Sequence, residues 1–60
     1  MHLLFRIKRH LRRTGLTPTR FGRLAVNDPR FVEDLERGRQ VRDATARRVH
    51  AWLDSHGERP

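Results

Sequence analysis

The feature that most constrains the fold of this chain is a pair of helix starts of the same kind, Thr17-Pro18 and Asp28-Pro29. In each pair a side-chain oxygen that can cap a helix precedes a proline, which suits the first helical position. The first helix spans only about two turns, Pro18–Ala25, before the second begins. Gly38 is expected to end the second helix. The sequence therefore predicts two short helices joined by a tight turn.

Apolar residues recur with the helical period in two segments that flank this pair. On a helix, residues 2–14 form one apolar stripe about 100° wide, with basic residues around the other side. That stripe consists of Leu3, Leu4, Ile7 and Leu11. Gly15 is expected to end this helix in the left-handed conformation. A further helix from about Asp43 to Ser55, ended by His56-Gly57, has a stripe of Thr45, Val49, Trp52 and Leu53. The predicted fold is all-α, with four short helices.

The two central helices supply the middle of the predicted core. The residues expected to face inward are Phe21, Leu24, Ala25, Val32 and Leu35, with Phe31 at the edge. Gly22 costs a short helix about 1 kcal/mol relative to alanine, so we expect a neighbouring helix to come close there. Asn27, in the turn Val26-Asn27, is expected to adopt the left-handed conformation.

The length of 60 residues allows one domain, predicted to span 1–57 and to be followed by a disordered tail at 58–60. A chain this short buries only about 60% of the surface that it exposes when unfolded. Because it has no cysteine to form a disulfide, a homodimer is one expected source of added stability. Trp52 is expected in the core or in a dimer interface, and Phe5 is expected to be exposed or to contact a partner.

The basic charge is concentrated in the first half of the chain, although the net charge is +7 overall. Residues 1–27 have no acid and seven basic side chains: Arg6, Lys8, Arg9, Arg12, Arg13, Arg20 and Arg23. From Asp28 onward, seven arginines balance seven acids. A one-sided basic surface attracts polyanions, of which nucleic acid is the first expectation, an anionic membrane the second and an acidic protein the third.

Several classes of function are not expected. No segment approaches the roughly 20 apolar residues of a membrane span, and cytoplasmic location is expected. Asp54, Ser55 and His56 are residue types of a catalytic triad, but successive helical positions point about 100° apart, so no enzyme is expected. The spacing of His2, His10, His50 and His56 fits no metal site, and these histidines are predicted at the surface. No cofactor is predicted.

Residues Phe21–Gly38 resemble the helix-turn-helix of the Cro and phage repressor-like regulators, the XRE family. Anchored on Glu36-Arg37-Gly38, the small residue of the family's second helix falls on Gly22 and its capping residue on Asp28. Its buried aliphatic residues fall on Val32 and Leu35. The resemblance covers roughly residues 3–55 and implies a lambda-repressor-like fold with a central helix-turn-helix.

The turn between the two central helices departs from the family pattern. The family usually has glycine at the turn followed by an aliphatic residue, where this chain has Val26 and Asn27. Either Asn27 takes the left-handed role and the turn is shifted by one residue, or the angle between the two helices differs from that of the family.

The resemblance implies that the helix at 29–37 enters the major groove of DNA. Arg30 is then the candidate for guanine O6 and N7, Phe31 for a thymine methyl, and Glu33 or Asp34 for cytosine N4. Glu33 and Asp34 have a second interpretation as solvated acids or as ion-pair partners of Arg37. The candidate phosphate contacts are Thr17, Thr19, Arg20, Arg23, Arg37, Arg39 and Arg42.

The leading hypothesis is a sequence-specific transcriptional regulator of bacterial or phage origin that binds double-stranded DNA, as a homodimer on a palindromic operator, in the nucleoid. A second hypothesis is an adaptor that uses the same fold to bind another regulator or RNA polymerase; the balanced charge of Arg30 and Arg37 against Glu33, Asp34 and Glu36 favours it. A third is a cationic peptide whose first helix acts on membranes, against which the well-formed helix ends argue.

Overall fold

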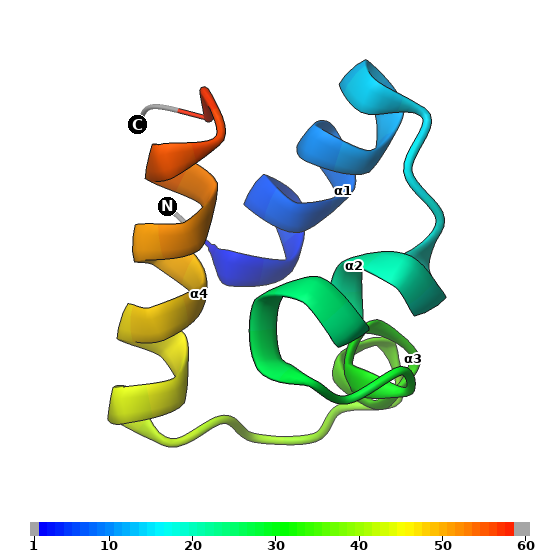
Figure 1. The fold of residues 1–60 in the computed structure, drawn as a ribbon. Coiled ribbons are helices and arrows are strands. Elements are labelled where there is room, and N and C mark those ends of the chain that lie inside the picture. Colours follow the sequence, from blue (N-terminus) through cyan, green and yellow to red (C-terminus); the bar gives the residue numbers. More distant parts are fainter. Residues whose placement is uncertain (1, 59–60) are drawn as a thin grey trace.

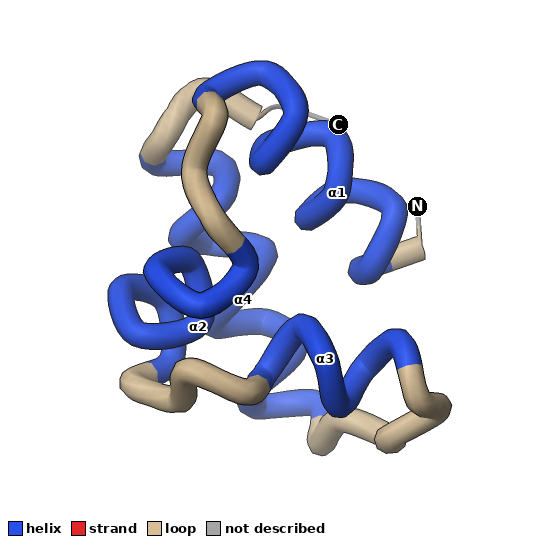
Figure 2. The backbone as a smooth tube through the Cα atoms, turned by 90° about the vertical axis from the view of Figure 1, so that its right-hand side faces the viewer, coloured by secondary structure: helices blue, strands red, loops and turns tan. Residues whose placement is uncertain are grey.

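The computed structural model describes residues 2–58, and within that range it has four helices and no strand (Figure 1). The helices are α1 (Leu3–Thr14), α2 (Pro18–Val26), α3 (Phe31–Glu36) and α4 (Asp43–Ser55). α2 packs against both α3 and α4, and α1 packs against α4 and α3. Figure 2 shows the short loop from α2 to α3, with α1 above α3. The radius of gyration of the Cα atoms is 10.3 Å, and the all-α prediction is confirmed.

Most helix ends follow from local capping chemistry, as predicted. The Oγ1 atom of Thr17 accepts a hydrogen bond from the backbone N–H of Arg20 at 3.2 Å and caps α2. Asn27 ends α2 with φ 57°, and Gly15 and Gly38 also have positive φ, at 76° and 98°. Each of these three residues turns the chain out of a helix in the left-handed conformation. The predicted bounds of α4, from about Asp43 to Ser55, are confirmed.

The start of α3 differs from the prediction, because the helix begins at Phe31 and not at Pro29. The Oδ1 atom of Asp28 accepts a hydrogen bond from the N–H of Arg30 at 3.0 Å, and the carbonyl of Asp28 accepts one from the N–H of Phe31 at 3.2 Å. Asp28 therefore stabilises a turn through Pro29 and Arg30 that precedes the helix. α3 has six residues, ending at Glu36.

The core lies where the four helices meet, with two corrections to its predicted membership. The buried apolar residues are Ile7, Phe21, Ala25, Phe31, Val32, Val49 and Leu53. Phe31 is buried at 1% exposure and does not lie at the edge, because Gly22 lets the Asp28 carbonyl approach α2 and so brings the start of α3 against that helix. Leu24 is 57% exposed, because Phe21 and Ala25, one turn apart, point the inner face of α2 away from it.

A buried polar cluster joins α1 to the end of α4, and the sequence did not predict it. Arg6 is 3% exposed; it donates hydrogen bonds to Asp54 Oδ1 at 2.7 Å and to His50 Nδ1 at 2.7 Å, and a third to the carbonyl of Glu58. Burying a guanidinium is favourable only with partners of this kind.

Two predictions about surface residues are wrong at this cluster. Glu58 is 3% exposed, accepts a hydrogen bond from Arg13 Nε, and lies 3.3 Å from His10 Nδ1, so residue 58 does not belong to a disordered tail. His10 is buried between Glu58 and the core instead of lying at the surface. Residues 59 and 60 of the predicted tail lie outside the described residues.

Candidate nucleic-acid interface

The contact between α2 and the turn before α3 is unusually close at Gly22. A Cβ atom at this position would lie 2.0 Å from the carbonyl oxygen of Asp28 and 3.4 Å from the Phe31 Cβ. The carbonyl of Gly22 also accepts a hydrogen bond from the N–H of Asp28 at 2.9 Å. This contact places the turn at Pro29 and Arg30 directly against α2. The predicted close approach is confirmed, although the nearest atom belongs to the turn backbone.

The start of α2 combines exposed threonines with arginines that have no acidic partner in residues 2–58. Thr17 and Thr19 are exposed, and so are Arg20 and Arg23 on the next turn. Within residues 2–58, neither Arg20 nor Arg23 has an acidic partner. Cations without partners beside a helix N-terminus are suited to bind an anion such as phosphate.

On the exposed side of α3, two arginines lie near the same carboxylate, that of Glu33. Arg37 Nη2 lies 3.2 Å from Glu33 Oε1, and Arg30 Nη2 lies 3.9 Å from the same oxygen. The predicted pairing of Glu33 with Arg37 at helical spacing is confirmed. All three side chains are at least half exposed, so both pairs are weak and open to exchange with another ligand.

Asp34 pairs with Arg39 and not with Arg37. Arg39 Nη1 lies 3.2 Å from Asp34 Oδ2 and 3.3 Å from Asp28 Oδ2, and its guanidinium carbon is 5.9 Å from the centre of the Phe31 ring. Arg39, which follows α3, thereby links Asp34 within the helix to Asp28 in the turn before it. Of the predicted phosphate contacts, Arg37 and Arg39 are therefore engaged with acids, whereas Arg42 has no acidic partner within residues 2–58.

Phe31, one of the predicted base contacts, is buried and cannot reach a base. Its side chain is buried in the core against α2 and has no exposed ring to offer a thymine methyl. The sequence placed it at the edge of the core, whereas the close contact between α2 and the turn before α3 brings its side chain inside. Arg30, Glu33 and Asp34 remain at or near the surface.

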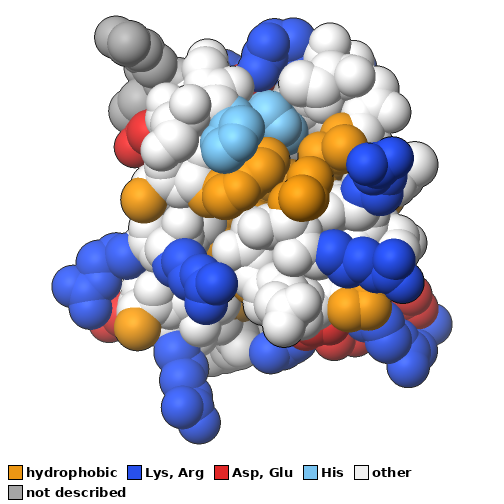
Figure 3. Space-filling model, in the orientation of Figure 1, with side chains coloured by type: hydrophobic (Ala, Val, Ile, Leu, Met, Phe, Trp, Pro, Cys, Tyr) orange, Lys and Arg blue, Asp and Glu red, His pale blue; other side chains and the backbone are white. Residues whose placement is uncertain are grey.

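The arginines without an acidic partner lie in three parts of the molecule: in α1, in α2, and in α4 with the loop before it. Within residues 2–58 the arginines without an acidic partner are Arg12, Arg20, Arg23, Arg42, Arg47 and Arg48. Figure 3 shows Lys and Arg side chains along the right-hand side and the lower part of one face, around an apolar and histidine patch. That face offers an anion many contacts at once.

The triad residue types near the end of α4 have separate partners. Asp54 pairs with Arg6, Ser55 Oγ donates to the carbonyl of Ala51 at 2.9 Å, and His56 Nδ1 lies 2.7 Å from the carbonyl oxygen of Trp52. Among the described residues, no group of three or more His, Cys, Asp or Glu side chains is arranged to hold a metal ion. Nor is any described helix long and apolar enough to cross a membrane.

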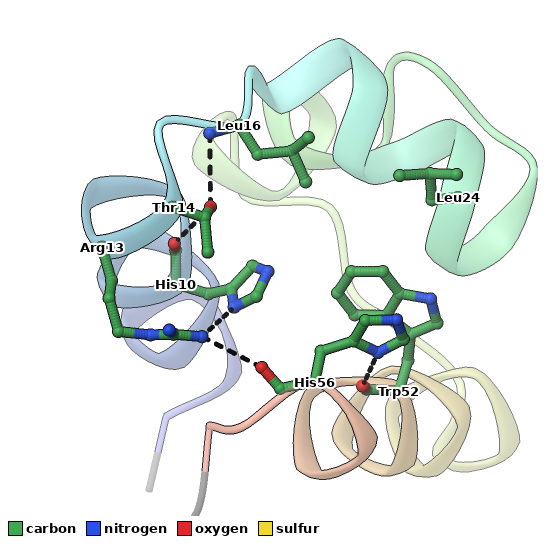
Figure 4. A pocket seen from close by; sticks show the side chains of 7 residues that line it. All are labelled: His10, Arg13, Thr14, Leu16, Leu24, Trp52 and His56. Carbon is green, nitrogen blue, oxygen red and sulfur yellow. Dashed lines mark hydrogen bonds between the residues drawn. The ribbon is translucent and has the colours of Figure 1, made fainter.

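An apolar pocket of about 450 Å³, which the sequence did not predict, lies between the end of α1, α2 and α4 (Figure 4). Leu24 faces the rings of Trp52 and His56 across this pocket. The available signal was Leu24 itself, an apolar residue next to Arg23 that was expected to face inward.

Comparison of the chain with known protein families, with curated proteins and with solved structures finds no match.

Proposed function

We propose that the chain binds double-stranded DNA through α2 and α3, arranged as a helix-turn-helix, and that it regulates transcription without enzymatic activity. The observation that carries the proposal is the set of exposed arginines on both sides of the α2–α3 contact. Arg20 and Arg23 have no acidic partner in residues 2–58, and Arg30 begins α3 with only one carboxylate, at 3.9 Å. The repressor-like spacing of residues 21–38 agrees with this assignment.

In the proposed complex the arginines of α2 hold phosphates and Arg30 reads a base. Arg20, Arg23 and Arg42 give up no protein ion pair on binding, so they contribute most to the sequence-independent affinity. Arg30 exchanges its weak contact with Glu33 for guanine O6 and N7 in the major groove. Arg37 and Arg39 must first leave Glu33 and Asp34, which lowers their contribution.

A homodimer on a palindromic operator is the proposed binding unit. A single six-residue helix presents few side chains to the bases, so two copies on half-sites about one helical turn apart supply the specificity that one lacks. We propose the bacterial cytoplasm or a phage-infected cell as the setting.

The test is a selection of random double-stranded DNA by the purified protein at about 150 mM salt. An enriched palindrome is expected. Arg30→Ala should then lose the preference at one position of each half-site, a change of about tenfold, with little effect on non-specific binding. Arg12→Ala is the matched control, because Arg12 is also exposed and unpaired but lies in the last turn of α1, away from α3 (Figure 1). If no sequence is enriched, the proposal of a sequence-specific regulator is wrong.

An adaptor that binds another regulator or RNA polymerase is the second candidate. The observation that favours it is the ion pairing around α3. Glu33 pairs with Arg30 and Arg37, and Asp34 pairs with Arg39, so these arginines are less available to DNA. Under this alternative the chain retains only salt-sensitive, non-specific DNA binding, and the selection enriches no sequence.

A further inference from the structure

Leu24 lines two pockets on the surface of α2, one beside aromatic rings and the other beside arginines. On one side lies the apolar pocket of about 450 Å³, with Leu16, Trp52 and His56 among its lining residues. On the other side a pocket of about 350 Å³ is lined by Leu24 together with Arg20 and Arg23. Figure 3 shows an apolar patch on one face of the molecule, with Lys or Arg side chains at its right-hand edge.

The wall of the apolar pocket is held in place by ring contacts. Trp52 meets Phe21 edge to face, with ring centres 5.2 Å apart, and stacks on His56 with centres 3.8 Å apart. The Nδ1 atom of His56 lies 2.7 Å from the carbonyl oxygen of Trp52. The carbonyl of His56 accepts a hydrogen bond from Arg13 Nη2 at 2.9 Å. Because these side chains are fixed beforehand, a bound group does not have to order them, which favours binding.

We propose that this groove, defined by Leu16, Leu24, Trp52 and His56 with Arg20 and Arg23 at its edge, binds an acidic amphipathic helix of a partner protein. Apolar side chains at helical spacing fit against Leu24 and Trp52, and carboxylates on the flank of the same helix reach the two arginines. Neither arginine has an acidic partner in residues 2–58, so the ion pairs form without breaking any within the protein.

Charge argues against a second copy of the chain as the occupant. α1 and α2, which form two sides of the groove, contain no acidic residue and seven basic ones. In a symmetric dimer through this face, the basic surface of α1 and α2 in one copy would face the same basic surface of the other, which is unfavourable. A partner with acidic residues removes this repulsion. The proposal does not rest on DNA binding, although it uses Arg20 and Arg23, the same arginines that the proposed function assigns to phosphates.

The experiment uses the full chain and a synthetic helical peptide of roughly 18 residues. The peptide has leucines at i, i+3, i+4 and i+7, glutamates on the flanks and no tryptophan. Trp52 is the only tryptophan of the protein, so its fluorescence reports occupation of the groove directly. We expect saturable one-to-one binding that shifts the Trp52 emission, and an affinity at least tenfold lower for a scrambled peptide or for one with glutamine in place of glutamate.

Leu24→Ser and Phe5→Ser form a matched pair of variants. The two side chains are equally exposed, at 57% and 58%, but Phe5 lines neither pocket. Leu24→Ser is expected to weaken peptide binding about tenfold or more, and Phe5→Ser to leave it unchanged. The double variant Arg20→Ala/Arg23→Ala should also weaken it, whereas Arg42→Ala, which removes an unpaired arginine outside the groove, should not. Circular dichroism verifies that each variant is folded.

Four outcomes would overturn the proposal. The first is no binding of the striped peptide, and the second is equal binding of the scrambled one, which would indicate non-specific electrostatics. The third is self-association of the protein that Leu24→Ser abolishes, which would assign the groove to a second copy. The fourth is binding of an oligonucleotide that depends on Leu24 but not on Phe5, which would assign it to nucleic acid.

Discussion

At the scale of single residues, Gly22 controls how closely α2 approaches the turn before α3. A Cβ atom there would lie 2.0 Å from the backbone oxygen of Asp28, so Gly22→Ala must displace the turn. We expect a loss of about 3 kcal/mol in the free energy of unfolding, measured by urea denaturation. Gly38→Ala meets no atom within 4 Å and strains only its φ of 98°, at a cost of about 1–2 kcal/mol. Equal losses for the two variants would contradict this account of the contact.

Titration of the buried cluster makes stability depend on pH. The hydrogen bond from Arg13 is the main cause that lowers the pKa of Glu58 below its ordinary value of 4.5. Burial and the neighbouring Arg6 guanidinium lower the pKa of His50 below 6.5. Because the folded protein holds these protons less tightly than the unfolded chain, each group stabilises the fold above its ordinary pKa. That contribution is lost as the pH falls through the lowered value.

We therefore expect the melting temperature to fall in two steps on acidification, one below pH 6.5 and one below pH 4.5. Glu58→Gln should remove the lower step only, and His50→Gln the upper step only, in melting curves recorded from pH 8 to pH 3. Each variant is the control for the other, because each should keep the step that the other removes. A pH profile that neither substitution changes would show that other groups govern acid stability.

At the scale of elements, α2 depends on its cap. Thr17→Ala removes the acceptor for the N–H of Arg20 and should cost about 1 kcal/mol, whereas Thr17→Ser should keep most of the stability. Thr19→Ala is the matched control, since Thr19 is exposed and, within residues 2–58, makes no side-chain hydrogen bond. Thermal unfolding measures both. A similar loss at Thr19 would mean that the threonines act through something other than the cap.

α3 is the element that packing supports most. Six residues are too few for a helix that is stable in water by itself. No side chain caps the start of α3, because Asp28 accepts its hydrogen bond from Arg30 in the preceding turn. Phe31 and Val32 hold it in the core, while Arg39 joins Asp34 to Asp28 across its ends. The tertiary contacts rather than helix propensity therefore set the orientation of Arg30.

At the scale of the whole molecule, the two proposals share Arg20 and Arg23. A helix bound in the groove and a DNA duplex on α2 are therefore expected to compete, so that the striped acidic peptide displaces labelled DNA from the protein in fluorescence anisotropy. Leu24→Ser should abolish the displacement while leaving DNA binding intact. Simultaneous binding of peptide and DNA would show that the two ligands use separate arginines.

The sequence alone determined the helices and most of their ends, because the signals involved are local. Thr17, Asn27, Gly15 and Gly38 each act through their own backbone or through atoms three or four residues away, which a linear reading captures. The size of the residue at position 22 likewise predicted a close approach, although it did not indicate which atoms would meet.

Tertiary structure alone decided which side chains are buried, paired or free. Arg6 finds His50 and Glu58 at separations of 44 and 52 residues, so no local pattern indicates that this cation leaves the surface. The same holds for Phe31, whose burial depends on the close approach of the turn before α3 to Gly22. The tertiary contacts determine which arginines of the candidate sites lack an acidic partner, as Arg20 and Arg23 do within residues 2–58.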